Sequence, residues 1–209
     1  MNVPILRHLG EVPFETSFNR MREFTRERLS DTPDEIWLLT HPSVYTLGLN
    51  GDPSHVLGNP PAPLIRTDRG GQVTWHGPGQ LVVYTLMDLQ RLEIGIRAYV
   101  TLIEQAIIAL LVQYGLSAES RREAPGVYVS GAKIASVGLK VTRGRCYHGF
   151  SLNVNPDLSA FDHINPCGYV ELKVTSLERL GVLTTTNEVM PGMIAAFLAQ
   201  PPLQYSASP

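Results

Sequence analysis

The sequence predicts an α/β fold, of the α+β kind, in which a mixed β-sheet is flanked by helices. Three observations predict it: short strand-like apolar segments recur along the chain, several are separated by glycine-bearing turns, and others by a long helical segment. Tight turns join antiparallel strands, whereas a helical connection also permits parallel ones. The chain has 209 residues, of which 44% are hydrophobic. That length suffices for a buried core, and a single domain over residues 1–209 is expected.

The first half of the chain is predicted to hold one helix followed by three strands. Residues 14–29 carry apolar side chains at helical spacing among Arg and Glu, which is typical of an amphipathic helix. Residues 36–40 form an apolar run and are predicted as a buried strand. Residues 50–63 contain Asn-Gly, Asp-Pro and Pro-Pro pairs and are predicted as a loop. Residues 72–75 are predicted as a short strand, and residues 81–87, apolar on both faces, as a central strand.

The second half is predicted to hold the longest helix, three further strands and two short helices. Residues 97–114 form that helix, which is apolar almost all round near its centre and therefore indicates deep burial. Gly115 is suited to end it. The strands are separated by glycine-bearing turns and lie at residues 126–129, 132–142 and 146–154. A long loop over residues 157–167 follows, and the short helices are expected at residues 175–180 and 187–199.

Composition and missing motifs exclude several kinds of protein. Lys plus Arg number 17 and Asp plus Glu number 19, a net charge of -2, which argues against a nucleic-acid binder. The start lacks the pattern of a signal peptide, and no uninterrupted apolar run reaches the ~18 residues of a membrane span. A cytoplasmic protein without membrane contact is therefore expected. The sequence holds no P-loop, no complete dinucleotide-binding fingerprint and no His-Glu-x-x-His motif, so neither a cofactor nor a metal is expected.

The two cysteines of the chain differ in their surroundings. Two cysteines cannot build a disulfide framework, which favours free thiols and a reducing compartment. Cys146 lies among apolar residues at the start of a predicted strand and is interpreted as a core residue. Cys167 lies between Pro and Gly in a loop, where a thiol would be accessible. A thiol of ordinary pKa is only about 3% ionised at pH 7, so a nucleophilic Cys167 needs a nearby cation or base. An ordinary loop cysteine is the alternative.

Lys133 is the candidate for that cation. Strand alternation places it on one face with four apolar side chains of the predicted strand 132–142. A lysine shielded from water can give or take a proton near neutral pH. A strand-end lysine that reaches out to solvent is the alternative. His76, which precedes a Gly-Pro-Gly turn, is a further candidate to line a pocket, and an ordinary turn histidine is the alternative there.

Five segments carry a resemblance to a known family. Residues 69–80 read Arg-Gly-Gly-Gln-Val-Thr-Trp-His-Gly-Pro-Gly-Gln, and residues 131–139 read Gly-Ala-Lys-Ile-Ala-Ser-Val-Gly-Leu. The other three are Ala-Pro-Gly-Val-Tyr at 124–128, His-Gly-Phe-Ser-Leu-Asn-Val-Asn at 148–155 and Ile-Asn-Pro-Cys-Gly at 164–168. In this order they resemble the lipoyl(octanoyl) transferases, a family of protein N-octanoyltransferases. The match covers roughly residues 30–180. Trp75 and Ser151 stand where the family more often shows a tyrosine and a smaller residue.

The resemblance implies an activity, partners and a fold. The family moves an octanoyl group from octanoyl-acyl carrier protein to one lysine of a lipoyl domain, the first step of endogenous protein lipoylation. The implied acceptors are the lipoyl domains of 2-oxoacid dehydrogenases and the glycine cleavage H protein. The enzyme is expected to act as a monomer, without a cofactor or metal. Its fold is expected to resemble the catalytic domains of biotin and lipoate protein ligases.

The resemblance also implies roles for individual residues. Cys167 matches the nucleophile that holds the acyl group as a thioester, and Lys133 matches the lysine that lowers the pKa of that thiol and transfers protons. The substrate-binding segments of the family match Arg69, Gly70, Gly71, Gln72, Val73, Thr74, Trp75 and His76, then Ser136, Val137 and Gly138, then Gly149, Phe150 and Ser151. Thioester exchange followed by amide formation needs no ATP, which agrees with the missing P-loop.

Three other functions are weighed beside the transferase. An ATP-dependent lipoate or biotin ligase of similar fold would load free octanoate and would not need Cys167. A non-catalytic module that binds acyl-proteins would hold the octanoyl carrier without thioester exchange. A thioesterase would release free octanoate even when an acceptor lipoyl domain is present.

Overall fold

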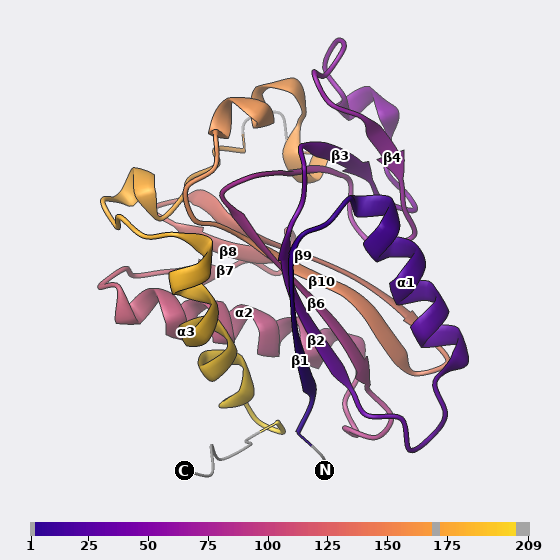
Figure 1. The fold of residues 1–209 in the computed structure, drawn as a ribbon. Helices are drawn as coiled ribbons and strands as arrows, with labels where there is room; N and C mark the ends of the chain where they lie inside the picture. Colours follow the sequence, from indigo (N-terminus) through magenta and orange to yellow (C-terminus); the bar gives the residue numbers. More distant parts are fainter. Residues whose placement is uncertain (1–2, 169–171, 204–209) are drawn as a thin grey trace.

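The computed structural model describes residues 3–168 and 172–203, apart from the side chain of Cys167. Its larger sheet has seven strands in the order β1-β2-β6-β10-β9-β8-β7 (Figure 1). These strands are β1 (Ile5–Glu11), β2 (Glu35–Thr40), β6 (Gln80–Asp88), β7 (Glu119–Ser120), β8 (Gly126–Val129), β9 (Ala132–Thr142) and β10 (Arg145–Asn153). β1 and β2 are parallel and the other neighbours are antiparallel. The predicted mixed sheet is therefore confirmed.

The helices cover both faces of this sheet. α1 (Phe14–Glu27) lies on one face, and α2 (Ile96–Gln113) and α3 (Thr186–Leu198) lie on the other (Figure 1). On the first face, Met21 of α1 packs in one apolar cluster with Val82 and Tyr84 of β6. Because both faces are covered, every residue of β6 is buried. That burial explains why residues 81–87 are apolar on both sides.

α2 packs against both the sheet and α3, and eight of its 18 residues are buried. By length and composition alone it could cross a membrane, the one helix of which this is true in the described part of the chain. In this fold Ile103, Ile107 and Leu111 are fully buried, in the same cluster as Phe197 of α3. The deep burial predicted near the centre of this helix is thus confirmed only in part, since Ile108 and Ala109 are half-buried and Val112 is 62% exposed.

The smaller sheet has three strands in the order β4-β3-β5. Their bounds are β3 (Val44–Leu47), β4 (Leu64–Arg66) and β5 (Val73–His76). Trp75 of β5 packs edge-on against Phe161, at 5.6 Å between ring centroids, and Phe161 belongs to the 3-10 helix η2 (Leu158–His163). A second 3-10 turn, η3 (Pro166–Gly168), follows. This packing holds the segment that carries Cys167 beside β5.

Most predicted elements are present, with ends that differ by at most two residues. The strands β1, β3, β4 and β7 were not predicted, and of these β3, β4 and β7 have four residues or fewer. β1 is an edge strand with mostly exposed side chains, so its sequence shows no apolar alternation. The helix expected over residues 175–180 is wrong, since only the 3-10 turn η4 (Glu178–Leu180) forms. The loop expected over residues 157–167 contains η2 as well.

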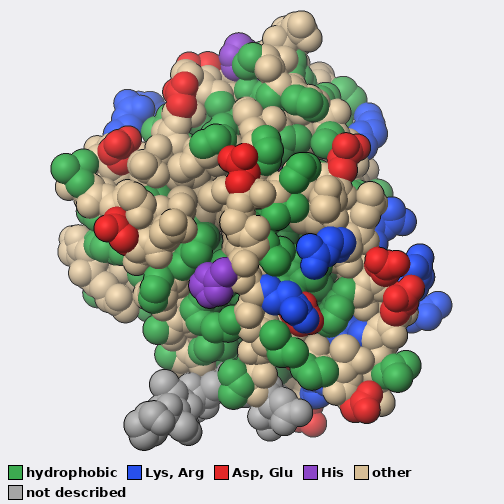
Figure 2. Space-filling view, viewed as in Figure 1, with side chains coloured by type: hydrophobic (Ala, Val, Ile, Leu, Met, Phe, Trp, Pro, Cys, Tyr) green, Lys and Arg blue, Asp and Glu red, His purple; other side chains and the backbone are tan. Residues whose placement is uncertain are grey.

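Charged side chains of both signs are mixed along α1 (Figure 2). Arg26 lies 2.9 Å from Glu27 and 4.0 Å from Glu23, and all three are exposed. Exposed pairs of this kind add little to stability. They also prevent α1 from presenting a purely basic surface.

Candidate active site

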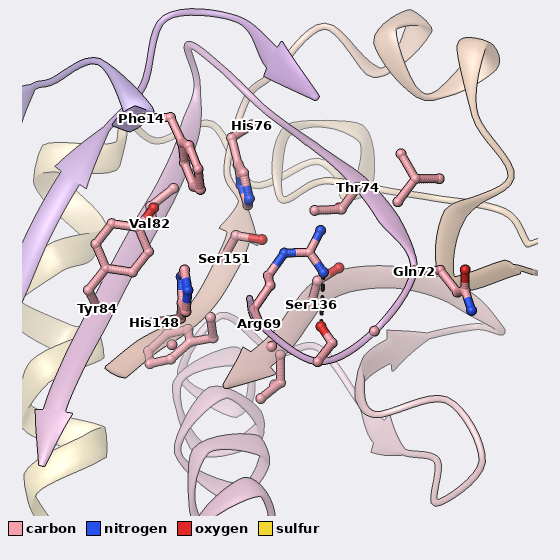
Figure 3. A pocket seen from close by; sticks show the side chains of 17 residues that line it. Phe14, Arg69, Gln72, Thr74, His76, Val82, Tyr84, Ser136, His148 and Ser151 are labelled. Carbon is pink, nitrogen blue, oxygen red and sulfur yellow. Dashed lines mark hydrogen bonds between the residues drawn. The ribbon is translucent and has the colours of Figure 1, made fainter. Parts of the chain in front are cut away.

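A cavity of about 60 Å³ lies above the centre of the larger sheet, on the face that α1 covers (Figure 3). Strands β6, β9 and β10 form its floor, and the segment that leads into β5 forms a wall. Its lining residues are Phe14, Arg69, Gly70, Gly71, Gln72, Val73, Thr74, His76, Val82, Tyr84, Ser136, Val137, Gly138, His148, Gly149, Phe150 and Ser151. The cavity therefore gathers residues that are far apart in the sequence.

The floor is flat because two glycines face each other across it. Gly138 of β9 and Gly149 of β10 are paired in the ladder between these strands. A Cβ added to Gly149 would lie 2.0 Å from the carbonyl oxygen of Val83 on β6, which is far inside contact distance. Only glycine lets β10 approach β6 this closely, because the β6 backbone occupies the position of a Cβ.

Arg69 ties the wall of the cavity to both sheets. Its side chain is buried, and Nη2 donates to the carbonyl oxygen of Thr46 at 2.6 Å and to the Thr46 hydroxyl at 2.8 Å. The next residue, Gly70, donates its N–H to the carbonyl oxygen of Leu139 on β9 at 2.9 Å. A buried guanidinium held by several acceptors fixes the segment strongly. Arg69 thus holds the wall in place beside the glycine floor.

Buried aromatic and histidine side chains close the other end of the cavity. His41 Nδ1 donates to the carbonyl oxygen of Val12, so its Nε2 accepts from the hydroxyl of Tyr84 at 2.7 Å. His76 Nδ1 donates to Oε1 of Gln80 at 2.7 Å. Burial lowers the pKa of His41 to about 4 and that of His76 to about 3. Both rings are therefore neutral at pH 7.

His148 is held at the same end by a carboxylate. Its Nε2 donates to Asp68 at 2.8 Å, and the hydroxyl of Tyr147 donates to the other oxygen of Asp68 at 2.5 Å. Burial lowers the pKa of His148, although Asp68 opposes this effect. Burial alone would raise the pKa of Asp68, but its two hydrogen bonds outweigh burial and lower it. His148 has φ +61, so the backbone here is strained and the surrounding contacts hold it.

Lys133 lies at the start of β9 and is not among the residues that line the cavity. Its side chain is 2% exposed, and Nζ donates to the carbonyl oxygen of Pro125 at 2.9 Å and lies 5.4 Å from the ring centroid of Tyr128. Glu104 of α2 accepts the N–H of Gly126 at 2.8 Å. Burial raises the pKa of Glu104, whereas this hydrogen bond and the Lys133 charge oppose that rise. The solvent-reaching alternative for Lys133 is excluded by its burial.

A bulge follows Lys133 and breaks the alternation predicted for this strand. The β8 partner advances by one residue, from Val127 to Tyr128, while β9 advances from Ala135 to Lys133. Ile134 is therefore an extra residue, and Ile134 and Ala135 are both buried in the same core. The prediction that Lys133 belongs to one regular face with Ala135 is wrong at this point, since the bulge re-aims its side chain.

The segment after Cys167 returns to Lys133 through the backbone. The N–H of Lys133 donates to the carbonyl oxygen of Lys173 at 2.8 Å, and its carbonyl oxygen accepts from Thr175 at 2.9 Å. The backbone of Cys167 itself lies in η3, where Gly168 donates to Asn165 at 3.0 Å. The side chain of Cys167 lies outside the described part of the structure. The hydrogen bonds place the backbone of Lys173 and Thr175, six and eight residues after Cys167, beside Lys133.

Cys146 and Trp75 do not line the cavity. Cys146 is fully buried in the core behind the sheet, and burial raises the pKa of its thiol, as suits the predicted packing residue. Trp75 alternates with Thr74 and His76 along β5 and points away from the cavity. It packs instead with Tyr45 and Phe161, and its Nε1 donates to Ser43 at 2.8 Å. The other residues predicted for substrate binding all line the cavity.

Four lining residues escaped the sequence analysis, namely Phe14, Val82, Tyr84 and His148. Phe14, Val82 and Tyr84 looked like ordinary core positions of a helix and a strand, which they also are. His148 directly precedes the predicted substrate-binding residues Gly149, Phe150 and Ser151. A histidine inside an otherwise apolar strand is unusual, and this could have marked it as a site residue. No group of three or more His, Cys, Asp and Glu side chains suited to a metal occurs among the described residues.

Comparisons with known proteins show the family to which the chain belongs. Residues 13–198 match the family described as the lipoyl protein ligase A/B catalytic domain. An octanoyltransferase of Methylococcus capsulatus is 56% identical, with 94% of this chain and 95% of the relative covered. An octanoyltransferase of Dechloromonas aromatica is 52% identical, with 88% and 90% covered.

Solved structures share the fold at low identity. A bipartite lipoate protein ligase of Thermoplasma acidophilum has a TM-score of 0.76 at 16% identity, with 95% of this chain and 83% of that chain covered. The biotin protein ligase of Aquifex aeolicus in complex with biotin and ATP has a TM-score of 0.57 at 13% identity, with 92% and 68% covered. These values confirm the expected ligase-like fold.

Proposed function

Because the chain belongs to the octanoyltransferases of the lipoyl protein ligase A/B catalytic-domain family, we propose that it moves octanoyl from acyl carrier protein to a lipoyl-domain lysine through a thioester on Cys167. One observation carries this proposal. The cavity is apolar at its buried end and borders β5, against which the turn that carries Cys167 packs. An acyl chain on that cysteine would have the cavity within reach.

The first half of the reaction exchanges one thioester for another. Lys133 would hold the proton of the Cys167 thiol as an ammonium, so that the thiolate attacks the octanoyl carbonyl carbon. The bond between that carbon and the carrier sulfur breaks, and the carrier thiolate takes the proton from Lys133. Lys133 is then a neutral amine beside an acyl-enzyme. The hydrogen bond from Nζ of Lys133 to the Pro125 carbonyl oxygen supports this role because it fixes the amine in place.

The second half transfers the octanoyl group to nitrogen. The amine of the substrate lysine attacks the thioester carbon, Lys133 takes a proton from that nitrogen, and the bond to Cys167 sulfur breaks. The thiolate and the Lys133 ammonium are restored, so the cycle closes without ATP or a metal. The backbone N–H groups of the glycine-rich segments would stabilise the developing oxyanion.

The proposal includes the partners and the setting of the reaction. The donor is octanoyl-acyl carrier protein, and the acceptors are lipoyl domains of 2-oxoacid dehydrogenases and the glycine cleavage H protein. A reducing cytoplasm suits a cysteine that must remain a thiol between turnovers. We also propose that the enzyme consists of a single domain and acts as a monomer.

Intact-protein mass spectrometry tests the covalent step. Incubation with octanoyl-acyl carrier protein is expected to add one octanoyl group to the wild type and none to Cys167→Ser. Cys146→Ser is the matched control and is expected to load like the wild type, because Cys146 is buried in the core. Full transfer to a lipoyl domain by Cys167→Ser would contradict the proposal. Loading of free octanoate only with ATP would favour a ligase instead.

A further inference from the structure

The cavity has one open end and one closed end. Gly70 and Gly71 are exposed and Gln72 and Thr74 are half-buried at the end near β5. At the other end Phe14 is 4%, Tyr84 4% and His148 2% exposed. Figure 3 shows the two groups on opposite sides of Arg69 and Ser151. A ligand can therefore enter at the first end and must stop at the second.

The open end is also the end nearest to the turn that carries Cys167. A Cβ added to Gly168 would lie 3.3 Å from Cγ of Gln72, so η3 and the entrance of the cavity are in contact. If the thioester forms on Cys167, as proposed above, its carbonyl lies at the entrance and the methyl end of the chain points to the closed end. The orientation of the acyl chain thus follows from the position of η3, the turn that carries Cys167.

We propose that Phe14, Tyr84 and His148 form an end wall that sets the longest acyl chain the enzyme accepts. This inference rests on the proposed function and extends it to the specificity for chain length. The cavity is small, about 60 Å³, and this wall closes its inner end. Added methylenes at the methyl end of the chain therefore have no room unless the wall moves.

The end wall is held by contacts on every side, so it acts as a fixed stop. Phe14 stacks on Phe18 at 5.7 Å and on His76 at 6.3 Å between ring centroids. Tyr84 lies edge-on to His148 at 6.1 Å, and its hydroxyl is bound to His41. Since His41 and His76 are neutral at pH 7, these two rings place no charge beside the methyl end of the chain.

Truncation of the wall tests the inference through chain-length preference. Acyl carrier proteins loaded with hexanoyl, octanoyl, decanoyl and dodecanoyl groups are compared by kcat/KM for transfer. In Phe14→Ala the decanoyl-to-octanoyl ratio is expected to rise about 15-fold, since two further methylenes become buried at about fourfold each. Phe14→Leu is expected to show a smaller rise, and Val82→Leu, which adds bulk to the floor, a shift toward hexanoyl.

Phe18→Ala is the matched control on the same helix. Phe18 stacks on both Phe14 and His148 but does not line the cavity, so its loss loosens the packing without lengthening the space. An unchanged ratio in folded Phe14→Ala and Phe14→Leu, or an equal rise in Phe18→Ala, overturns the end wall. Failure of the wild type to load octanoyl on Cys167 instead overturns the proposed thioester, and the two outcomes are read from separate measurements.

Discussion

Gly126 leaves the space in which the side chain of Lys133 lies. Its φ is +139, a conformation that glycine adopts readily. A Cβ added at this position would lie 2.4 Å from the carbonyl oxygen of Ala135 and 2.6 Å from Cε of Lys133. The first contact is with backbone, so the strand itself would have to shift. Glycine at this position is therefore a condition for the observed placement of Lys133.

Gly126→Ala is expected to displace Lys133 and to move the titration of the Cys167 thiol to higher pH. Once the thiol pKa lies above the working pH, each further unit lowers the thiolate fraction about tenfold, and transfer should fall in proportion. The measurement is the rate of alkylation against pH, with Lys133→Met as the reference for complete loss of the ammonium.

Gly131→Ala serves as the control for that change. Gly131 also has positive φ, in the turn between β8 and β9, but an added Cβ there would meet nothing closer than Arg121 at 3.8 Å. It therefore adds backbone strain without a collision. An unchanged alkylation curve in Lys133→Met would remove Lys133 from thiol activation, whereas an unchanged curve in Gly126→Ala alone would show that Lys133 keeps its place.

At the scale of elements, α3 supports the cavity floor from behind. Phe197 of α3 lies 6.3 Å from Phe150 of β10 between ring centroids, and Phe150 borders the cavity. The helix begins with a capping box, in which the Thr185 hydroxyl accepts from the N–H of Glu188 and the Glu188 carboxylate accepts from the N–H of Thr185 at 2.8 Å. These bonds satisfy two backbone donors at the helix start.

Thr185→Ala is expected to lower the free energy of unfolding by about 1 kcal/mol, since the cap bond is lost and the helix start is left unsatisfied. Urea denaturation followed by circular dichroism measures it. Thr186→Ala, one residue later, is the control and should cost less because the cap is kept. Equal losses in the two variants would show that the cap contributes nothing specific.

At the scale of the whole molecule, the buried histidines make stability depend on pH. In the folded state burial lowers the pKa of His41 to about 4 and that of His76 to about 3, against 6.5 for an ordinary histidine. Below pH 6.5 the unfolded chain therefore binds more protons than the folded one. Stability then falls as the pH falls toward 4. His148 shifts in the same direction.

Between pH 7 and pH 5 the free energy of unfolding is expected to fall by about 4 kcal/mol from His41 and His76 together. Carboxyl groups with lowered pKa values, such as Asp68, contribute mainly below this range. Urea denaturation at a series of pH values gives the slope. His76→Gln, which keeps an amide near Gln80, should reduce that slope by about half. A flat profile from pH 7 to pH 5 would contradict the neutral, buried histidines.

Much of the fold could be predicted because its signals are local. Periodicity identified the three α-helices and most of the buried strands, and motif segments singled out Cys167 and Lys133. The strands that escaped are short or exposed, as β1 shows, so burial left little pattern in their sequences. The end wall escaped for another reason, because Phe14 and Tyr84 are core residues whose neighbours across the cavity are far away in the chain.

The sequence by itself determined the order of the elements, the glycine positions and the residue types available for chemistry, since each depends on neighbours along the chain. The tertiary structure decided which of them meet. It turned Trp75 away from the cavity, re-aimed Lys133 through the bulge at Ile134, and placed His148 against Asp68 at the closed end. Strand register and packing fix these outcomes, and both are set by contacts between distant segments.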